Sequence, residues 1–283
     1  MKGALSFLSR KFELCKQIYS AIKKTNCPSK SLRLIKRTML SLLFLITAIL
    51  YSSVGFGGGS TYLALLTIWD IPYSQLPLVA LSCNVIVVLG NCINYIRAGN
   101  LRLKLLLPYL MSSIPLAFLG GSLAISKSFF EIALFISLTT AGILLFFKSR
   151  STEQAETSYS DTPLLLSIPI GGLLGFVSGV IGIGGGIFLS PILFLLKAAP
   201  PKQIATTASL FILINSVSGI FGQFTKAHSI TDLKSYWLLL IAVLIGGQIG
   251  NLLHLKLLSP QKLTMITAGL VLFVGLRMGF RLI

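Results

Sequence analysis

The chain has 283 residues, of which 54% are hydrophobic and only 11% are charged, and its formal net charge is +17. Soluble globular proteins carry about 25% charged residues, so this composition excludes an ordinary soluble domain. The positive charge does not indicate nucleic-acid binding, because it lies in an N-terminal segment and between apolar segments. The four cysteines form no C-x-x-C pair, so neither a disulfide framework nor a metal site is expected.

Residues 1–37 form a basic segment that holds ten of the 24 lysines and arginines. Apolar side chains recur in it at helical spacing, at Leu5, Leu8, Phe12, Cys15, Tyr19 and Ile22. The segment is predicted to be either an amphipathic helix on an anionic lipid leaflet or a partly disordered tail. A basic flank before a first span favours a cytoplasmic N-terminus, and hence the cytoplasmic (inner) membrane.

Eight apolar segments follow, and a helix needs roughly 20 apolar residues to cross a bilayer. They are residues 38–69, 76–96, 105–125, 130–147, 163–196, 203–224, 236–254 and 263–276. The predicted fold is therefore an all-α integral membrane protein of about eight transmembrane units. A polar linker, 149–162, separates a first membrane repeat, 38–148, from a second, 163–283.

The second half repeats the first at an offset close to 127 residues. The glycines of run 55–59 match those of run 182–186, Ser82 matches Ser209, and residues 140–142 match residues 267–269. Matches in this order at one offset are difficult to obtain by chance. They predict two homologous four-unit repeats, an arrangement that is typical of secondary transporters.

Each glycine run interrupts the first unit of its repeat. Residues 38–69 would form a straight helix about 48 Å long, whereas the hydrocarbon core is only about 30 Å thick. The runs Gly55-Phe56-Gly57-Gly58-Gly59 and Gly182-Ile183-Gly184-Gly185-Gly186 are expected to break these helices. Free backbone groups at such breaks are tolerated in a membrane only where protein or a watery cavity satisfies them.

Helices that begin after these breaks would point unpaired N–H groups into the protein, and such helix ends bind anions. The predicted backbone part of a substrate site is Gly57, Gly58, Gly59, Ser60, Gly184, Gly185, Gly186 and Ile187. The alternative is that these glycines only permit close helix packing. That role is the one expected for the small-residue ridge Gly171, Gly175 and Gly179.

Neutral polar side chains within the spans are the candidate side-chain contacts: Ser82, Asn84, Ser209 and Asn215. For each of them, interhelical hydrogen bonding is an equally good explanation. The spans contain no central Asp, Glu or His, so a proton relay, a catalytic site, a metal site and a bound cofactor are not expected. The chain is therefore not expected to be an enzyme.

The two glycine runs, with Pro191 after the second, resemble the signature of the TauE/SafE family of sulfite exporters. Residues 205–209, Ala-Thr-Thr-Ala-Ser, are also similar to that family, and the resemblance covers residues 38–283. Ala64 stands where the second half has Pro191, which weighs against identical half-sites. The resemblance implies an exporter of small sulfur-containing anions such as sulfite or organosulfonates.

The distribution of basic residues bears on topology. If every unit crosses the membrane once, the loops and the C-terminus, without the basic tail, place nine basic residues on the cytoplasmic side and five outside. If the first and fifth units are hairpins, the count reverses to five on the cytoplasmic side and nine outside. The count favours eight crossings with both termini cytoplasmic, while hairpins would produce inverted repeats. The favoured function is a secondary transporter of a small anionic solute; the alternatives are a non-transporting membrane scaffold or assembly factor and a transporter of an unrelated small solute. The oligomeric state stays open, a homo-oligomer included.

Overall fold

The structure is a computed structural model. It describes residues 30–53, 55–69, 71–150, 162–226 and 236–254, with the single residues Gly269, Leu272, Leu276 and Gly279. The chain divides into two compact units, residues 1–40 and 41–283. Of the first unit, only the start of one helix is described. The predicted amphipathic tail helix, the centre of the linker and most of the eighth apolar segment lie outside the described residues.

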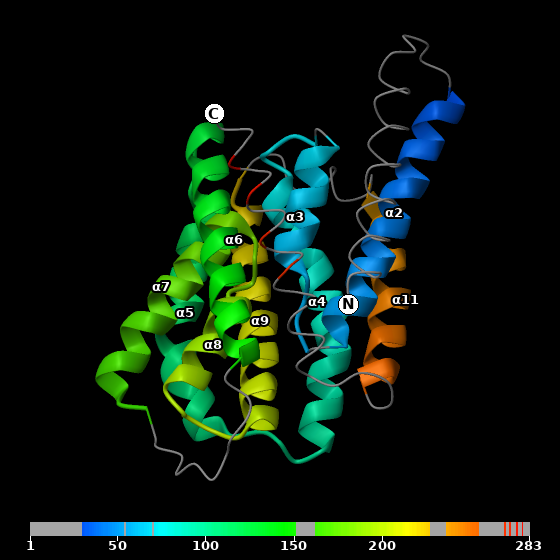
Figure 1. The fold of residues 1–283 in the computed structure, drawn as a ribbon. Helices are drawn as coiled ribbons and strands as arrows, with labels where there is room; N and C mark the ends of the chain where they lie inside the picture. Colours follow the sequence, from blue (N-terminus) through cyan, green and yellow to red (C-terminus); the bar gives the residue numbers. More distant parts are fainter. Residues whose placement is uncertain are drawn as a thin grey trace. The chain divides into compact units, whose positions relative to one another are not determined.

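The elements of the described residues are α-helices, and no strand is found among those residues. In chain order they are α2 (Lys30–Ser52), α3 (Gly59–Ile68), α4 (Leu76–Arg97), α5 (Leu103–Ser122), α6 (Lys127–Arg150), α7 (Leu164–Ile181), α8 (Gly186–Leu195), α9 (Pro201–Phe224) and α11 (Trp237–His254) (Figure 1). Five of them, α4, α5, α6, α7 and α9, contain a stretch long and apolar enough to cross a membrane. The predicted all-helical membrane fold is confirmed at this level.

Helices α4 and α9 lie at the centre of the second unit. Within their apolar spans, 67% of the residues of α4 and 61% of those of α9 are buried inside the protein, against 24% in α6. Large apolar side chains on the outer helices are instead exposed, among them Leu165 at 88% and Met111 at 71%. Such a surface is stable against lipid tails and unfavourable against water, which fits a multi-pass membrane protein.

The chain reverses direction between α2 and α3. The ring of Phe44 stacks on the ring of Tyr62, with centroids 4.7 Å apart, and the Tyr51 and Thr61 hydroxyls are 2.7 Å apart. If α3 continued in line with α2, the helical residues alone would separate Phe44 from Tyr62 by roughly 16 Å. The two helices therefore form a hairpin whose turn is the first glycine run.

The second glycine run turns the chain in the same way. A Cβ atom added to Gly185 would lie 3.2 Å from the Leu174 carbonyl oxygen and 3.5 Å from Cβ of Ser178, so the chain returns alongside α7. Eight separate crossings are therefore not confirmed, and these contacts agree with hairpins at the first and fifth units, the alternative that the sequence left open. Glycines with left-handed backbone, at Gly55 and Gly182 for example, allow the reversal, and a count of loop charges does not detect it.

Three helices of the second unit run in one direction. Gly246 and Gly250 of α11 face the carbonyls of Leu45 and Ile49 of α2, so a step of four residues on one helix matches a step of four on the other. Helix α11 also lies parallel to α4, where its Gly247 contacts Val87 and where Gly90 contacts Gln248 and Asn251.

Three other helices run in the opposite direction. The ridge Gly171, Gly175 and Gly179 of α7 packs on Tyr109, Ser113 and Ala117 of α5, again in steps of four. Helix α5 is parallel to α9, because Ser218 donates to the Ile114 carbonyl and Gly222 faces the Phe118 carbonyl.

Helices α4 and α9 are antiparallel. Leu81 contacts Gly219, while Tyr95 and Ser209 both approach Gly55, so later positions on α4 lie beside earlier positions on α9. The helices that occupy matching places in the two halves, α2 with α7 and α4 with α9, therefore point in opposite directions. Each first helix packs on the helix of the third apolar segment of the other half, α2 on α11 and α7 on α5.

Candidate functional site

Both glycine runs use left-handed backbone at matching positions. The φ angles are 85° at Gly55 and 84° at Gly58 in the first run, and 92° at Gly182 and 75° at Gly185 in the second. Residues with a Cβ atom rarely adopt these angles. Gly58 and Gly185 directly precede α3 and α8, two helices of ten residues each. The local need for glycine is therefore the same at these two positions, whereas Gly184, with a φ of 90°, is left-handed and its counterpart Gly57 is not.

The N-terminal ends of α3 and α8 meet inside the protein. A Cβ atom added to Gly59, the first residue of α3, would lie 2.8 Å from the carbonyl oxygen of Ile183 in the other run. Only glycine permits this approach between the two backbones. The sequence predicted that two such helix ends would converge, and the structure brings them together.

Asn84 of α4 lies between the two runs. Its Nδ2 donates to the Ile183 carbonyl over 3.0 Å, and a side chain at Gly57, Gly59 or Gly184 would collide with its amide. Asn84 is fully buried, and its Oδ1 has no hydrogen-bond partner among the described residues. An amide in this position links the second run to a helix of the first half.

Ser209 of α9 makes the reciprocal connection. Its hydroxyl donates to the Gly55 carbonyl over 2.6 Å, across 154 residues of chain. Its counterpart Ser82 instead donates to the Leu78 carbonyl of its own helix, and Asn215 donates to the Phe211 carbonyl of its own helix. Of the four predicted side chains, Asn84 and Ser209 touch the runs, whereas Ser82 and Asn215 hydrogen-bond within their helices.

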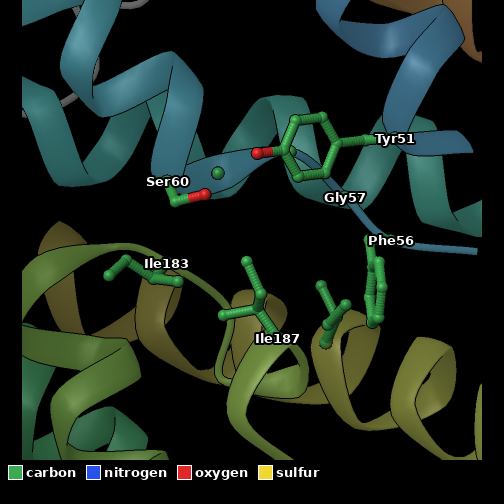
Figure 2. Close-up of a pocket in the computed structure, with 9 residues that line it drawn as sticks. Tyr51, Phe56, Gly57, Ser60, Ile183 and Ile187 are labelled. Atoms are coloured by element: carbon green, nitrogen blue, oxygen red, sulfur yellow. The ribbon is translucent and has the colours of Figure 1, made fainter. Parts of the chain in front are cut away.

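A small cavity lies where the runs meet (Figure 2). Its lining residues come from both halves: Tyr51, Phe56, Gly57, Gly58, Gly59, Ser60, Ile183, Ile187 and Ile212. Its volume is about 10 Å³, which is about the space of one water molecule. A larger ligand can enter only when the two helix ends move apart.

The cavity presents hydrogen-bond donors and no charged side chain. Within the described residues, the amides of Gly57, Gly58, Gly59 and Ser60 donate to no backbone carbonyl. The buried Tyr62 hydroxyl has no partner there either and lies next to Gly58, while the buried Ser60 hydroxyl lies beside the Tyr51 hydroxyl. Free amides at a helix N-terminus carry partial positive charge, so the site favours a negative group.

Sequence reasoning missed part of this site. Tyr51, Phe56 and Ile183 line the cavity. The buried Ser178 and Ser216 hydroxyls, which have no hydrogen-bond partner in the described part of the chain, flank the second run. Tyr51 precedes the first run by four residues, one helical turn, and could have been found on that ground. Ile212 lies on a helix far along the chain, and its role depends on tertiary packing.

The described residues contain no group of three or more His, Cys, Asp or Glu side chains that could hold a metal ion. Cys83 and Cys92 are both buried and free.

A protein-family model described as "Sulfite exporter TauE/SafE" matches residues 40–278. The chain is 27% identical to the probable membrane transporter protein y4hK of Sinorhizobium fredii, over 84% of this chain and 96% of that protein. It is 24% identical to the probable membrane transporter protein YunE of Bacillus subtilis, over 84% and 95%. No solved structure matches it. Because the family model covers most of the sequence, this chain belongs to the sulfite exporter TauE/SafE family.

Proposed function

We propose that this protein is a secondary transporter that moves a small anion through the site where the two glycine runs meet. The observation that carries the proposal is the set of amides at Gly57–Ser60, which donate to no backbone carbonyl among the described residues and lie beside the buried hydroxyls of Ser60 and Tyr62. Donors without a lysine or arginine hold an anion loosely enough to release it again, and a transporter needs that release.

The state of the carbonyls in the two runs supports an anion over a cation. The Gly55 and Ile183 carbonyls accept hydrogen bonds from Ser209 and Asn84, and the Gly58 carbonyl accepts from amides of α3. A cation site needs such oxygens as ligands, and these three carbonyls each already accept a hydrogen bond. The amides of Gly57–Ser60 donate to no backbone carbonyl of the described residues, and the unpaired side-chain acceptor beside them is Asn84 Oδ1.

The helix directions support a mechanism. We propose that residues 38–148 and 163–283 are inverted repeats, each a hairpin followed by three crossing helices. Helices α2 and α7 run in opposite directions, as do α4 and α9. Each hairpin would then enter from a different side of the membrane. Movement of one hairpin at a time would expose the site alternately to the two sides, as in other inverted-repeat transporters.

The proposed solute is a sulfur-containing anion of the sulfite or organosulfonate type, moved outward, because the family is described by sulfite export.

The proposed location is the inner membrane with a cytoplasmic N-terminus. In the hairpin topology, ten basic residues of the tail and five of the loops and C-terminus lie on the N-terminal side, against nine on the other. The basic tail would then contact the anionic leaflet.

Flux through proteoliposomes tests this function. The wild-type protein should move at least one anion among sulfite, sulfate, methanesulfonate and chloride, and Gly58→Leu and Gly185→Leu should abolish that flux. Gly99→Leu is the matched control, because Gly99 also has a positive φ, 71°, but no atom lies near its missing side chain. No flux of any anion from correctly inserted wild-type protein would reject anion transport in favour of another solute or of the scaffold alternative.

A further inference from the structure

The two halves place different side chains on a similar helix start, where Gly58 and Gly185 have the same left-handed backbone. An offset of 127 residues pairs Ser60, Thr61 and Tyr62 at the start of α3 with Ile187, Phe188 and Leu189 at the start of α8. The first half thus puts three hydroxyls where the second half puts three hydrocarbon side chains. All six residues are buried, so the difference lies inside the protein and is not a choice between surface residues.

The same division appears in the cavity. In Figure 2, Tyr51 and Ser60 lie on one side and Ile183 and Ile187 on the other. Ile212 adds to the apolar lining, and the three isoleucines are between 2% and 5% exposed. We call Ile183, Ile187 and Ile212 the isoleucine wall.

A bare inorganic oxyanion fits this cavity poorly. Its oxygens would accept hydrogen bonds on the α3 side, but any oxygen that faced the isoleucine side chains would lose its water and meet hydrocarbon, which offers no side-chain donor. An unpaired buried polar group is strongly unfavourable. An anion with an alkyl substituent meets both sides: donors for the charged group and hydrocarbon for the substituent.

We propose that the site selects anions that carry a small apolar substituent, with the charged group at the N-terminus of α3 and the substituent against the isoleucine wall. The proposal rests on the anion-transport function above and adds the orientation of the ligand. Ser60 and Ile187, which occupy the same place in the two halves, then determine selectivity. Ser60 acts on the charged group and Ile187 acts on the substituent.

The test is binding and flux of methanesulfonate, ethanesulfonate and propanesulfonate, which share one charged group and differ in alkyl length. For wild-type protein, affinity should rise about fourfold from the methyl to the ethyl compound, the increase expected for burying one methylene. Ile187→Ser copies the first half into the second and should remove this rise. Ser60→Ala should weaken binding of all three compounds by the same factor and leave the rise intact.

Ile192→Ser is the matched control, since Ile192 lies on α8 outside the cavity lining, and it should keep the wild-type rise. If Ile187→Ser does not fold, Ile187→Thr, which retains a branched side chain, replaces it with the same expected direction. Wild-type protein that transports the three sulfonates with equal affinity would overturn this inference and leave anion transport standing. Protein that neither binds nor moves any of them would overturn both.

Discussion

The two glycine runs show which features of this site depend on backbone and which on side chains. Both runs use left-handed glycines directly before a ten-residue helix, and a central helix of the other half donates a hydrogen bond to each. Their side chains differ: α3 begins with hydroxyls and α8 with hydrocarbon. The shared part builds the meeting point, and the part that differs decides what is held there.

The largest effect is expected where the shared backbone geometry is disturbed. A Cβ atom at Gly182 would lie 2.6 Å from Cα of Pro77 on a backbone with φ of 92°. Strain and overpacking together should destabilise Gly182→Ala by about 2 to 5 kcal/mol, measured as thermal unfolding in detergent. Gly99→Ala has the strain without the clash and should lose only about 1 kcal/mol. Equal losses of stability in the two variants would contradict the close approach of Gly182 to the backbone of Pro77.

A smaller effect is expected at the amide that joins the halves. Asn84→Leu removes the donor to the buried Ile183 carbonyl and should cost about 1 to 3 kcal/mol of stability. Anion flux should fall by about tenfold or more, since a loss of about 1.4 kcal/mol of binding free energy corresponds to a factor of ten. Asn91→Leu on the same helix is the comparison, because Asn91 accepts from Ser52, whereas Asn84 is the asparagine that lies against Gly57, Gly59 and Gly184. A similar loss of flux in both variants would argue against a special role for Asn84.

The smallest effect separates two serines at matching positions. Ser209→Ala removes a 2.6 Å hydrogen bond to the Gly55 carbonyl in the other half, and about 1 kcal/mol of stability should be lost. Ser82→Ala removes only a bond to the Leu78 carbonyl within its own helix and should be close to neutral. Unfolding temperatures of the two variants, measured side by side, decide the matter. A larger loss for Ser82→Ala than for Ser209→Ala would show that the hydrogen bond from Ser209 to the Gly55 carbonyl does not stabilise the first run.

Much of the fold could be read from the sequence because membrane helices must satisfy their own backbone. Charge-free segments located the helices, and the glycine runs located the breaks. The direction of the chain after each break could not be read, because Gly55 and Gly182 permit both a kink and a reversal. Phe44 and Tyr62 decide between them only once their contact is known.

The candidate site was predictable in its backbone and less so in its side chains. The repeat of the glycine runs drew attention to Gly57–Ser60 and Gly184–Ile187, and these segments lie together. Asn84 was one of many polar residues in the spans, and nothing in its local sequence distinguishes it from Asn215. Asn84 contacts the second run because α4 and α9 cross at the centre, and that crossing depends on the whole fold.

Cysteine protection tests most directly whether the two runs form one site. In a background with the four natural cysteines replaced by alanine, Ser60→Cys and Ile187→Cys are each treated with a membrane-permeant maleimide while the concentration of ethanesulfonate is raised. One shared site predicts that both cysteines are protected, with the same half-maximal concentration. Protection of only one cysteine, or protection at clearly different concentrations, would contradict a shared site.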